Sequence, residues 1–342
     1  MNLYSLLRPA LFSFPPEKAH NMALNLSSLM MGKTYQDKAL VQRLVGIEFA
    51  NPVGLSAGFD KNAQAINGLS KLGFGFLELG TVTPLSQVGN PKPRMFRLIE
   101  DEAVINRLGF NNEGLDVFCE NFSKAKRTLP LGANIGKNKD QEDAVADYIT
   151  GLEAVSPLAD YVTVNISSPN TKGLRDLQEK GALRDLLTPL MERRTKPIFL
   201  KVAPDLENLQ IEHIAQTVMD LKVDALIVSN TTLERAESLQ SIHQVESGGL
   251  SGSPLFEKST AILKRFAQET RGEMMLIGVG GIASGADAYA KIKAGASLVQ
   301  LYSALVYQGP ALIHRINKEL VQLLAQDGYS HISEAIGADV SS

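Results

Sequence analysis

The sequence predicts an α/β protein, a closed (β/α)8 barrel (TIM barrel) preceded by a two-helix amphipathic extension. From about residue 50, eight short apolar runs alternate with segments of helical period. Most of these runs are continuous in Val, Ile, Leu and Phe, as is typical of parallel strands covered on both faces. Eight such units favour a closed barrel over an open doubly wound sheet, and 342 residues suit one barrel.

The first thirty residues predict the two helices. Their apolar faces are Leu3, Leu6, Leu7, Ala10, Leu11 and Phe14, then Ala19, Met22, Ala23, Leu26, Leu29 and Met30. Pro15-Pro16 separate the two faces, and Gly32 is the expected stop. The helices could simply pack on the main domain, or they could form an apolar groove for a membrane or a lipid-like ligand. Because Arg8 is the only charge before Glu17, we favour the groove, and we divide the chain into an extension of residues 1–32 and a barrel domain of residues 33–342.

The eight strands follow in order along the chain. They are Val53–Phe59, Phe76–Val82, Leu131–Gly136, Tyr161–Ser168, Ile198–Ala203, Ala225–Thr231, Met275–Gly281 and Ser297–Ser303. Helices are predicted between them at Asp143–Val155, Ile211–Leu221, Ser259–Thr270 and Ala286–Ala294. The second and third strands, and the sixth and seventh, are widely separated, so each of these long segments can carry an active-site loop.

Composition excludes several classes of function. Lys and Arg (34) nearly balance Asp and Glu (37), so no basic excess points to nucleic acid. The single cysteine, Cys119, excludes an internal disulfide and a cysteine-rich metal site, and we expect no metal. No apolar run reaches the roughly 20 residues that span a bilayer. With no signal-peptide cleavage pattern either, we expect a soluble or peripheral protein.

Polar residues gather at the carboxyl ends of the predicted strands, where such barrels hold their active sites. Asn134, Asn165 and Lys201 interrupt apolar strands, which is costly unless they meet polar partners. One of them could be a satisfied core amide, but several at one rim predict a polar ligand. We interpret Lys201 as a buried charge beside an anionic ligand. Lys61 either pairs with Asp60 at the surface or binds an anion.

A glycine-rich turn follows the seventh strand. Gly280-Gly281 leads to Gly285 and a predicted helix, and the eighth strand ends in Tyr302-Ser303. Barrels often bind phosphate at these two loops through backbone N–H groups. Such turns also serve tight turning alone, but this placement favours a phosphate site.

Six ordered motifs carry a family resemblance. They are NPVGLSAGFDK (51–61), GTVTP (80–84), PRMFR (93–97), NRLGF (106–110), NISSPN (165–170) and GGLSG (248–252). The chain resembles dihydroorotate dehydrogenase, specifically the membrane-associated, quinone-reducing class of bacteria and mitochondria (class 2). The resemblance extends from about Tyr4 to Leu324, and the tail after it carries no motif.

The resemblance implies oxidation of (S)-dihydroorotate to orotate in de novo pyrimidine (UMP) biosynthesis. One non-covalent FMN per chain would accept the hydride, and ubiquinone or menaquinone would be the final electron acceptor. The implied FMN contacts are Ala57, Gly58, Phe59, Asp60, Lys61, Thr81, Asn134, Asn165, Lys201, Ser229, Gly252, Gly281, Tyr302 and Ser303. Ser229 stands where many relatives have threonine, and both residues supply a hydroxyl.

The resemblance also implies a pyrimidine site. Its residues would be Lys61, Asn106, Arg107, Leu108, Gly109, Phe110, Asn165, Asn170, Asn230 and Thr231. Asparagine amides offer both donors and acceptors, so they match the edge of a pyrimidine ring. Lys61 would hold the orotate carboxylate, and Lys201 would stabilise negative charge on the N1–O2 side of the flavin.

Ser168 is the implied general base, removing the proton from C5 while hydride leaves C6. Serine is a weak base, so it must pass the proton on through a neighbouring hydroxyl or water. Its alternative role is a turn residue before Pro169. The soluble class has cysteine at this position, so Ser168 and the helical extension favour the quinone class.

His20, Arg97 and Tyr302 are the implied quinone contacts, although a lone histidine beside an apolar helix face is more often structural. We expect a monomer, peripheral on the cytoplasmic face of the bacterial inner (cell) membrane. Three alternatives stay open: a soluble fumarate-reducing relative, a dihydrouridine synthase, and a non-catalytic, membrane-peripheral flavoprotein or phosphate-binding barrel. Ser168 and the extension argue against the first. The absence of a basic excess argues against the second.

Overall fold

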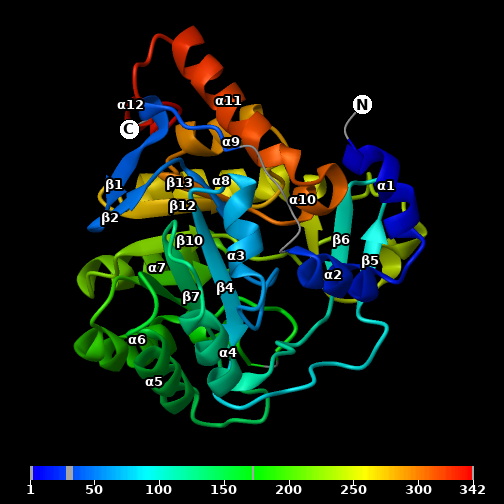
Figure 1. Cartoon of the computed structure of the whole chain (residues 1–342). Helices are drawn as coiled ribbons and strands as arrows, with labels where there is room; N and C mark the ends of the chain where they lie inside the picture. Colours follow the sequence, from blue (N-terminus) through cyan, green and yellow to red (C-terminus); the bar gives the residue numbers. More distant parts are fainter. Residues whose placement is uncertain (1–2, 28–33, 172, 341–342) are drawn as a thin grey trace.

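The computed structural model describes residues 3–27, 34–171 and 173–340 (Figure 1). Its centre is a closed barrel of parallel strands in the order β3-β4-β7-β8-β9-β10-β12-β13, in which β13 pairs back to β3. The strands are β3 (Val53–Leu55), β4 (Phe76–Val82), β7 (Leu131–Ile135), β8 (Tyr161–Asn165), β9 (Ile198–Val202), β10 (Ala225–Val228), β12 (Met275–Val279) and β13 (Leu298–Leu301). The predicted barrel and its eight strands are confirmed.

Most strands are shorter than the apolar runs that predicted them. The run expected to reach Ser168 leaves the sheet after Asn165, and the run expected to reach Thr231 leaves it after Val228. The polar carboxyl ends therefore lie in loops above the barrel, where they can line a site rather than pair with a neighbouring strand.

Helices surround the barrel. They are α3 (Ile66–Leu69), α4 (Gly114–Ser123), α5 (Ala144–Val155), α6 (Lys180–Arg193), α7 (Asn208–Asp220), α8 (Phe256–Glu269), α9 (Gly285–Lys293), α10 (Ser303–Gln308), α11 (Ala311–Gln326) and α12 (Ile332–Ala335). Short 3-10 helices lie at η2 (Lys38–Leu40), η3 (Ser70–Leu72), η4 (Arg175–Gln178), η5 (Ile242–Val245) and η6 (Ser253–Leu255). The four predicted helices are confirmed as α5, α7, α8 and α9.

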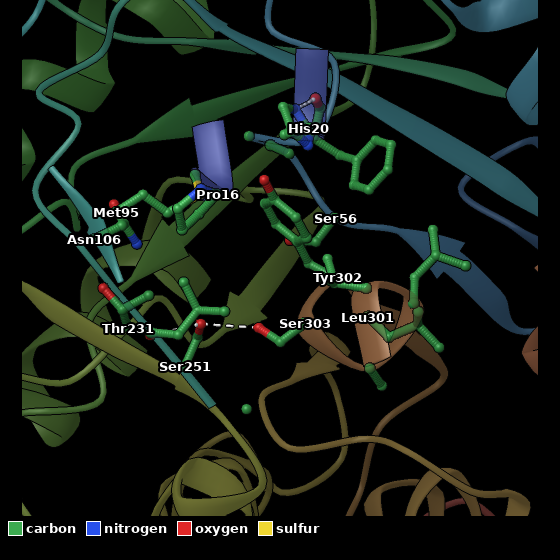
Figure 2. A pocket seen from close by; sticks show the side chains of 18 of the residues that line it. Pro16, His20, Ser56, Met95, Asn106, Thr231, Ser251, Leu301, Tyr302 and Ser303 are labelled. Carbon is green, nitrogen blue, oxygen red and sulfur yellow. Dashed lines mark hydrogen bonds between the residues drawn. The ribbon is translucent and has the colours of Figure 1, made fainter. Parts of the chain in front are cut away.

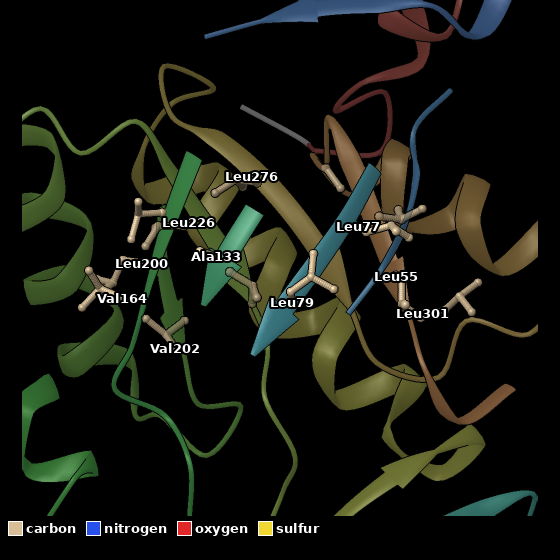
Figure 3. Close-up of a cluster of buried hydrophobic side chains, with 14 of the residues drawn as sticks. Leu55, Leu77, Leu79, Ala133, Val164, Leu200, Val202, Leu226, Leu276 and Leu301 are labelled. Atoms are coloured by element: carbon tan, nitrogen blue, oxygen red, sulfur yellow. The ribbon is translucent and has the colours of Figure 1, made fainter. Parts of the chain in front are cut away.

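The strands bury side chains on both faces. One set of buried aliphatic residues belongs to the core cluster shared with the surrounding helices (Figure 3), and includes Leu55, Leu77, Leu79, Ala133, Val164, Leu200, Val202, Leu226, Leu276 and Leu301. A second cluster combines the aromatic residues Phe49, Phe76, Tyr161 and Phe199 with aliphatic side chains such as Ile227. Phe49 ends the hairpin of β1 (Gln42–Leu44) and β2 (Ile47–Phe49). Burial on both faces explains why the strands read as continuous apolar runs.

A small antiparallel sheet, absent from the sequence prediction, assembles from the two long segments between barrel strands. It consists of β5 (Met95–Leu98), β6 (Ala103–Asn106) and β11 (Gly249–Gly252), in the order β11-β6-β5. β5 and β6 come from the segment after β4, and β11 comes from the segment after β10. The two expected active-site loops are thus joined to each other.

The predicted N-terminal helices are present as α1 (Leu3–Phe12) and α2 (Pro16–Asn25), and they lie beside β5 and β6 (Figure 1). Arg97 of β5 donates to the carbonyls of Phe12 (2.9 Å) and Phe14 (2.6 Å), which holds the end of α1. The expected contributions of Leu29 and Met30, the stop at Gly32 and the boundary at residue 32 lie outside the described residues. Among the described helices, none is long and apolar enough to cross a membrane.

Candidate active site

A cavity of about 560 Å³ extends from the carboxyl end of the barrel to helices α1 and α2. Figure 2 shows Pro16 and His20 from α2 near one edge of it, and Thr231, Ser251 and Ser303 away from them. Its α1–α2 end is apolar, with Leu7, Leu11, Phe12, Met22, Ala23 and Leu26 among the lining residues. The cavity therefore joins a polar chamber to an apolar mouth.

Most of the residues singled out from the sequence line this cavity. They are His20, Ala57, Gly58, Phe59, Lys61, Thr81, Arg97, Asn106, Leu108, Gly109, Phe110, Asn165, Ser168, Asn170, Lys201, Ser229, Asn230, Thr231, Gly252, Gly281, Tyr302 and Ser303. Asp60, Asn134 and Arg107 stand outside the lining. The structure thus brings together in one space residues that are spread over nearly 300 positions of the chain.

Each of the three residues outside the lining has protein partners. The Asp60 carboxylate accepts the amides of Gln64 (3.0 Å) and Ala65 (2.8 Å), so it fixes the loop after β3. Arg107 pairs with Glu246 at 2.8 Å, between β6 and the segment before β11. The remaining residue, Asn134, belongs to a buried network beneath the cavity.

That network starts from Glu78, a fully buried carboxylate on β4. Its oxygens accept hydrogen bonds from Asn134 (2.8 Å), Thr163 (3.1 Å) and Gln300 (2.8 Å). Because a carboxylate only accepts, the Asn134 amide must direct its NH2 group toward Glu78 and its oxygen toward the cavity side. Glu78 therefore sets the orientation of Asn134.

The orientation of the Asn134 amide in turn sets the orientation of the Asn165 amide. The Asn134 oxygen accepts from Thr81 at 2.5 Å and from Asn165 Nδ2 at 3.2 Å. Asn165 Oδ1 in turn accepts the Ser167 hydroxyl at 3.0 Å, and Ser167 Oγ accepts Asn230 Nδ2 at 2.9 Å. The amides of β7, β8 and the loop after β10 are consequently held in defined orientations before any ligand binds.

Lys201 is a second buried charge, on β9. Its Nζ donates to Ser56 Oγ at 3.1 Å, and the side chain lines the cavity. Burial lowers the pKa of Lys201, while the negative charge of Glu78 opposes that change. An anionic or electron-rich ligand edge beside Lys201 would stabilise its charged form.

The polar chamber contains a cluster of amides and hydroxyls. Asn170 Nδ2 donates to the carbonyl and to the side-chain oxygen of Asn106, at 3.1 and 3.3 Å. Thr231 Oγ1 is buried and has no hydrogen-bond partner among the described residues. A buried polar atom without a partner is costly, so Thr231 points to a ligand that completes its hydrogen bond.

Ser168 lies in the loop after β8 and is only 6% exposed. Its Oγ accepts the backbone amide of Asn170 at 3.3 Å, the local bond expected of a serine in a turn. Ser168 therefore takes part in a turn and also lines the cavity.

Lys61, in the loop after β3, donates from Nζ to the carbonyl of Gly58 at 2.8 Å. Burial lowers the pKa of Lys61 to about 8, with Glu17 and Asp60 opposing the change. The ammonium is consequently charged at neutral pH and lines the cavity, which suits an anionic ligand.

Two glycines form a close-fitting wall at the other side of the chamber. Gly281 has φ +75°, and a Cβ there would lie 2.4 Å from Phe256 Cβ. Gly252 has φ +102°, and its Cβ would lie 2.3 Å from the carbonyl oxygen of Glu102. Both positions require glycine. Ser251 and Ser303 are hydrogen-bonded at 2.8 Å nearby, so hydroxyls and backbone converge at the place predicted to bind phosphate.

Aromatic rings separate the polar chamber from the apolar mouth. The rings of Phe59 and Tyr302 lie 5.1 Å apart, and the His20 ring lies 4.9 Å from Phe59 and 6.1 Å from Tyr302. Burial and the charge of Lys61 lower the pKa of His20 to about 4, so it is neutral at pH 7. Burial raises the pKa of Tyr302. Neither side chain carries charge into the apolar mouth.

Sequence comparison decides the family. A sequence model described as dihydroorotate dehydrogenase matches residues 39–324 of the chain. The chain belongs to the dihydroorotate dehydrogenase family. Two curated relatives named dihydroorotate dehydrogenase (quinone) come from Azorhizobium caulinodans and Novosphingobium aromaticivorans. They are 50% and 48% identical, and each alignment covers 99% of this chain and 100% of the relative.

A solved dihydroorotate dehydrogenase has the same fold. The crystal structure of DHODH in complex with ferulenol from Eimeria tenella is 41% identical, with a TM-score of 0.91 over 97% of this chain and 98% of that chain. The predicted family and fold are confirmed by these likenesses.

Sequence reasoning missed two charged groups that lie outside the cavity lining: Glu78, which is fully buried, and Arg175, which is partly buried. Glu78 interrupts the apolar run FLELGTV, the same signal that drew attention to Lys201, and it could have been found in that way. Arg175 carries no comparable signal, because it lies in a polar segment and two of its three partners, Asp205 and Thr231, are distant in sequence. Both act behind the cavity wall rather than in it.

Proposed function

We propose that this protein is an FMN-dependent oxidoreductase that oxidises (S)-dihydroorotate to orotate and delivers the electrons to ubiquinone or menaquinone, a step of de novo pyrimidine biosynthesis. The single observation that carries the proposal is the continuous cavity, which joins a chamber of asparagines and lysines to an apolar mouth between α1 and α2. A planar, amide-edged substrate and a long-tailed quinone need these two environments. Relatives named dihydroorotate dehydrogenase (quinone), which align with this chain over their whole length, support a quinone as the acceptor.

The residues present fit FMN. Lys201 is a buried lysine that lines the cavity, and Gly252, Gly281 and Ser303 line it at the loops where a phosphate would meet backbone N–H groups. The proposed contacts are those implied by the family resemblance, with Asp60 and Asn134 acting on the site through neighbouring residues. When bound, FMN accepts a hydride from the substrate and passes electrons onward.

The amide cluster supports the pyrimidine assignment. Asn106, Asn165, Asn170 and Asn230 offer donors and acceptors to the ring edge, and the Thr231 hydroxyl supplies one further bond. Lys61 holds the carboxylate. Leu108, Gly109 and Phe110 enclose the ring from the loop after β6, while Arg107 fixes that loop through Glu246.

Ser168 acts as the general base in this proposal. It lines the cavity, is nearly fully buried, and takes the proton from C5 of dihydroorotate. Because a serine hydroxyl is weakly basic, the proton passes on to a neighbouring hydroxyl or water, and burial keeps that transfer away from bulk solvent.

The extension, residues 1–32, serves quinone and membrane, and residues 33–342 form the catalytic domain. His20, Arg97 and Tyr302 line the cavity. In this proposal they contact the quinone head. Leu6, Leu7 and Leu26 are more than half exposed, which suits peripheral contact with lipid on the cytoplasmic face of the cell membrane. The protein acts as a monomer.

Steady-state assays test the proposal. Orotate should form from dihydroorotate with a quinone as acceptor, and not with fumarate or NAD+. Turnover with fumarate but not with quinone would favour the soluble class, and no turnover with any acceptor would favour a non-catalytic flavoprotein.

A further inference from the structure

We propose that Arg175 is a positioning residue that holds the loops carrying Ser168 and Thr231 in the mutual arrangement needed for proton removal. Arg175 stands outside the cavity lining and begins η4, after the loop that follows β8. The inference rests on the proposed function, because that function assigns Ser168 and Thr231 their roles.

The Arg175 guanidinium reaches three loops at once. Its Nε donates to the carbonyl of Ser167 at 3.1 Å, and its Nη2 donates to the carbonyl of Thr231 at 2.8 Å. Its Nη1 pairs with Asp205, in the loop after β9, at 2.8 Å. Ser167 directly precedes Ser168 in the chain. The Arg175 side chain therefore fixes both the backbone next to the proposed base, Ser168, and the backbone of Thr231.

The geometry requires arginine. A guanidinium presents its donors in a rigid, planar fork, so it can satisfy two carbonyls and a carboxylate in different directions. A lysine ammonium is one point charge on a flexible chain and cannot hold the same three acceptors in a fixed plane. Arg175→Lys should therefore keep the ion pair with Asp205 but weaken the hydrogen bonds to the carbonyls of Ser167 and Thr231.

Asp205 is itself held in place. Its carboxylate accepts from Thr232, from the Leu233 amide at 3.0 Å and from Lys258 at 2.9 Å. Burial acts to raise the pKa of Asp205, but hydrogen bonds from Thr232, Lys258, Leu233 and Arg175 lower it to about 2. Asp205 is thus ionised at any working pH and fixes the guanidinium plane.

The test measures two steps in the flavin-loaded, full-length protein. Stopped-flow absorbance gives the rate constant of flavin reduction at saturating dihydroorotate, and calorimetry gives the affinity for orotate. We expect Arg175→Gln to slow reduction by about thirtyfold while weakening orotate binding by less than about fivefold, because misplaced reacting groups cost rate more than affinity. Arg175→Lys should slow reduction by about tenfold.

Arg194→Gln is the matched control. Arg194 pairs with Asp224 at 2.5 Å, is partly buried like Arg175, and lies at the amino-terminal end of the barrel, before β9. The variant should lower the unfolding temperature but leave the reduction rate within about twofold, because distant sites act independently. An equal loss of rate in Arg194→Gln would mean general destabilisation and would overturn the proposal.

The outcomes separate the inference from the function on which it rests. If the parent protein is not reduced by dihydroorotate, the proposed function fails. If the parent is reduced and folded Arg175→Gln is reduced equally fast, only the role of Arg175 fails. Should Arg175→Gln not fold, Arg175→Lys decides: a tenfold slower reduction supports positioning, and the parent rate overturns it.

Discussion

His20 Nε2, on α2, lies 2.7 Å from the carbonyl oxygen of Phe59, in the loop after β3. A carbonyl only accepts, so the Nε2 atom carries the hydrogen. This bond ties the extension to the same loop that contains Lys61. The apolar mouth and the polar chamber are therefore joined by a direct contact.

His20 should make stability depend on pH. Burial, with the charge of Lys61, lowers its pKa to about 4, whereas an unfolded histidine titrates near 6.5. Its contribution to the free energy of unfolding is complete above about pH 6.5 and is lost as pH falls toward 4, by up to about 3 kcal/mol. His20→Gln keeps a donor for the Phe59 carbonyl but does not titrate. Its urea midpoint should fall less than that of the parent between pH 7 and 4.5. Equal falls would contradict this assignment.

Orotate binding should weaken at high pH because of Lys61. Burial lowers the pKa of Lys61 to about 8, so its charge is lost as pH rises through that value, while orotate stays an anion. The association constant, measured by calorimetry from pH 6.5 to 9.5, should fall by up to about tenfold for each pH unit above 8. Lys61→Met should bind weakly at every pH in this range. A flat profile in the parent protein would remove Lys61 from the carboxylate site.

The barrel was predictable because its strands are buried on both faces, and strands buried in this way consist of continuous apolar runs. The antiparallel sheet of β5, β6 and β11 was not, since its strands are too short to show a period and β11 pairs with β6 across more than 140 residues. Helix α6 was not predicted either. Residues that line the cavity were found partly through polar residues and glycines at the strand ends, such as Lys201 and Gly281, and partly through the family resemblance.

Residues that act from behind the cavity were harder to find. Asp60 and Arg107 belong to motifs, and Asn134 interrupts an apolar strand, but neither signal says whether a side chain faces the ligand or supports a neighbour. Arg175 is specified by three acceptors that meet only in the folded chain.

Ser168→Ala should bind orotate nearly as well as the parent protein but slow flavin reduction by about a hundredfold, the usual cost of losing a positioned base. Ser168→Cys should keep part of the rate with a shifted pH dependence, because a thiol ionises more readily. Ser156 is the matched control, since it is equally buried (6%) and bonds to the Leu152 carbonyl within α5. If Ser168→Ala reduced its flavin at the parent rate, Ser168 would be only a turn residue.

A charge in the apolar mouth should impair only the quinone step. Leu11, on α1, lines the mouth, and Leu11→Glu places a carboxylate where an isoprenoid tail would lie. Turnover with a long-tailed quinone should fall by about tenfold or more, whereas flavin reduction by dihydroorotate should stay unchanged. The control is Leu209→Glu, on the exposed surface of α7, where the leucine is 60% exposed. Unchanged turnover of long-tailed quinones in Leu11→Glu would place the quinone elsewhere.

The central claim is that one cavity serves dihydroorotate and quinone in turn through a bound flavin. Anaerobic mixing of the purified protein with dihydroorotate, followed by a quinone, tests it most directly. The flavin absorbance should bleach with about one orotate formed per FMN, and it should return when the quinone is added. A flavin that stays oxidised with dihydroorotate, or one that bleaches but is not reoxidised by quinone, would contradict the account.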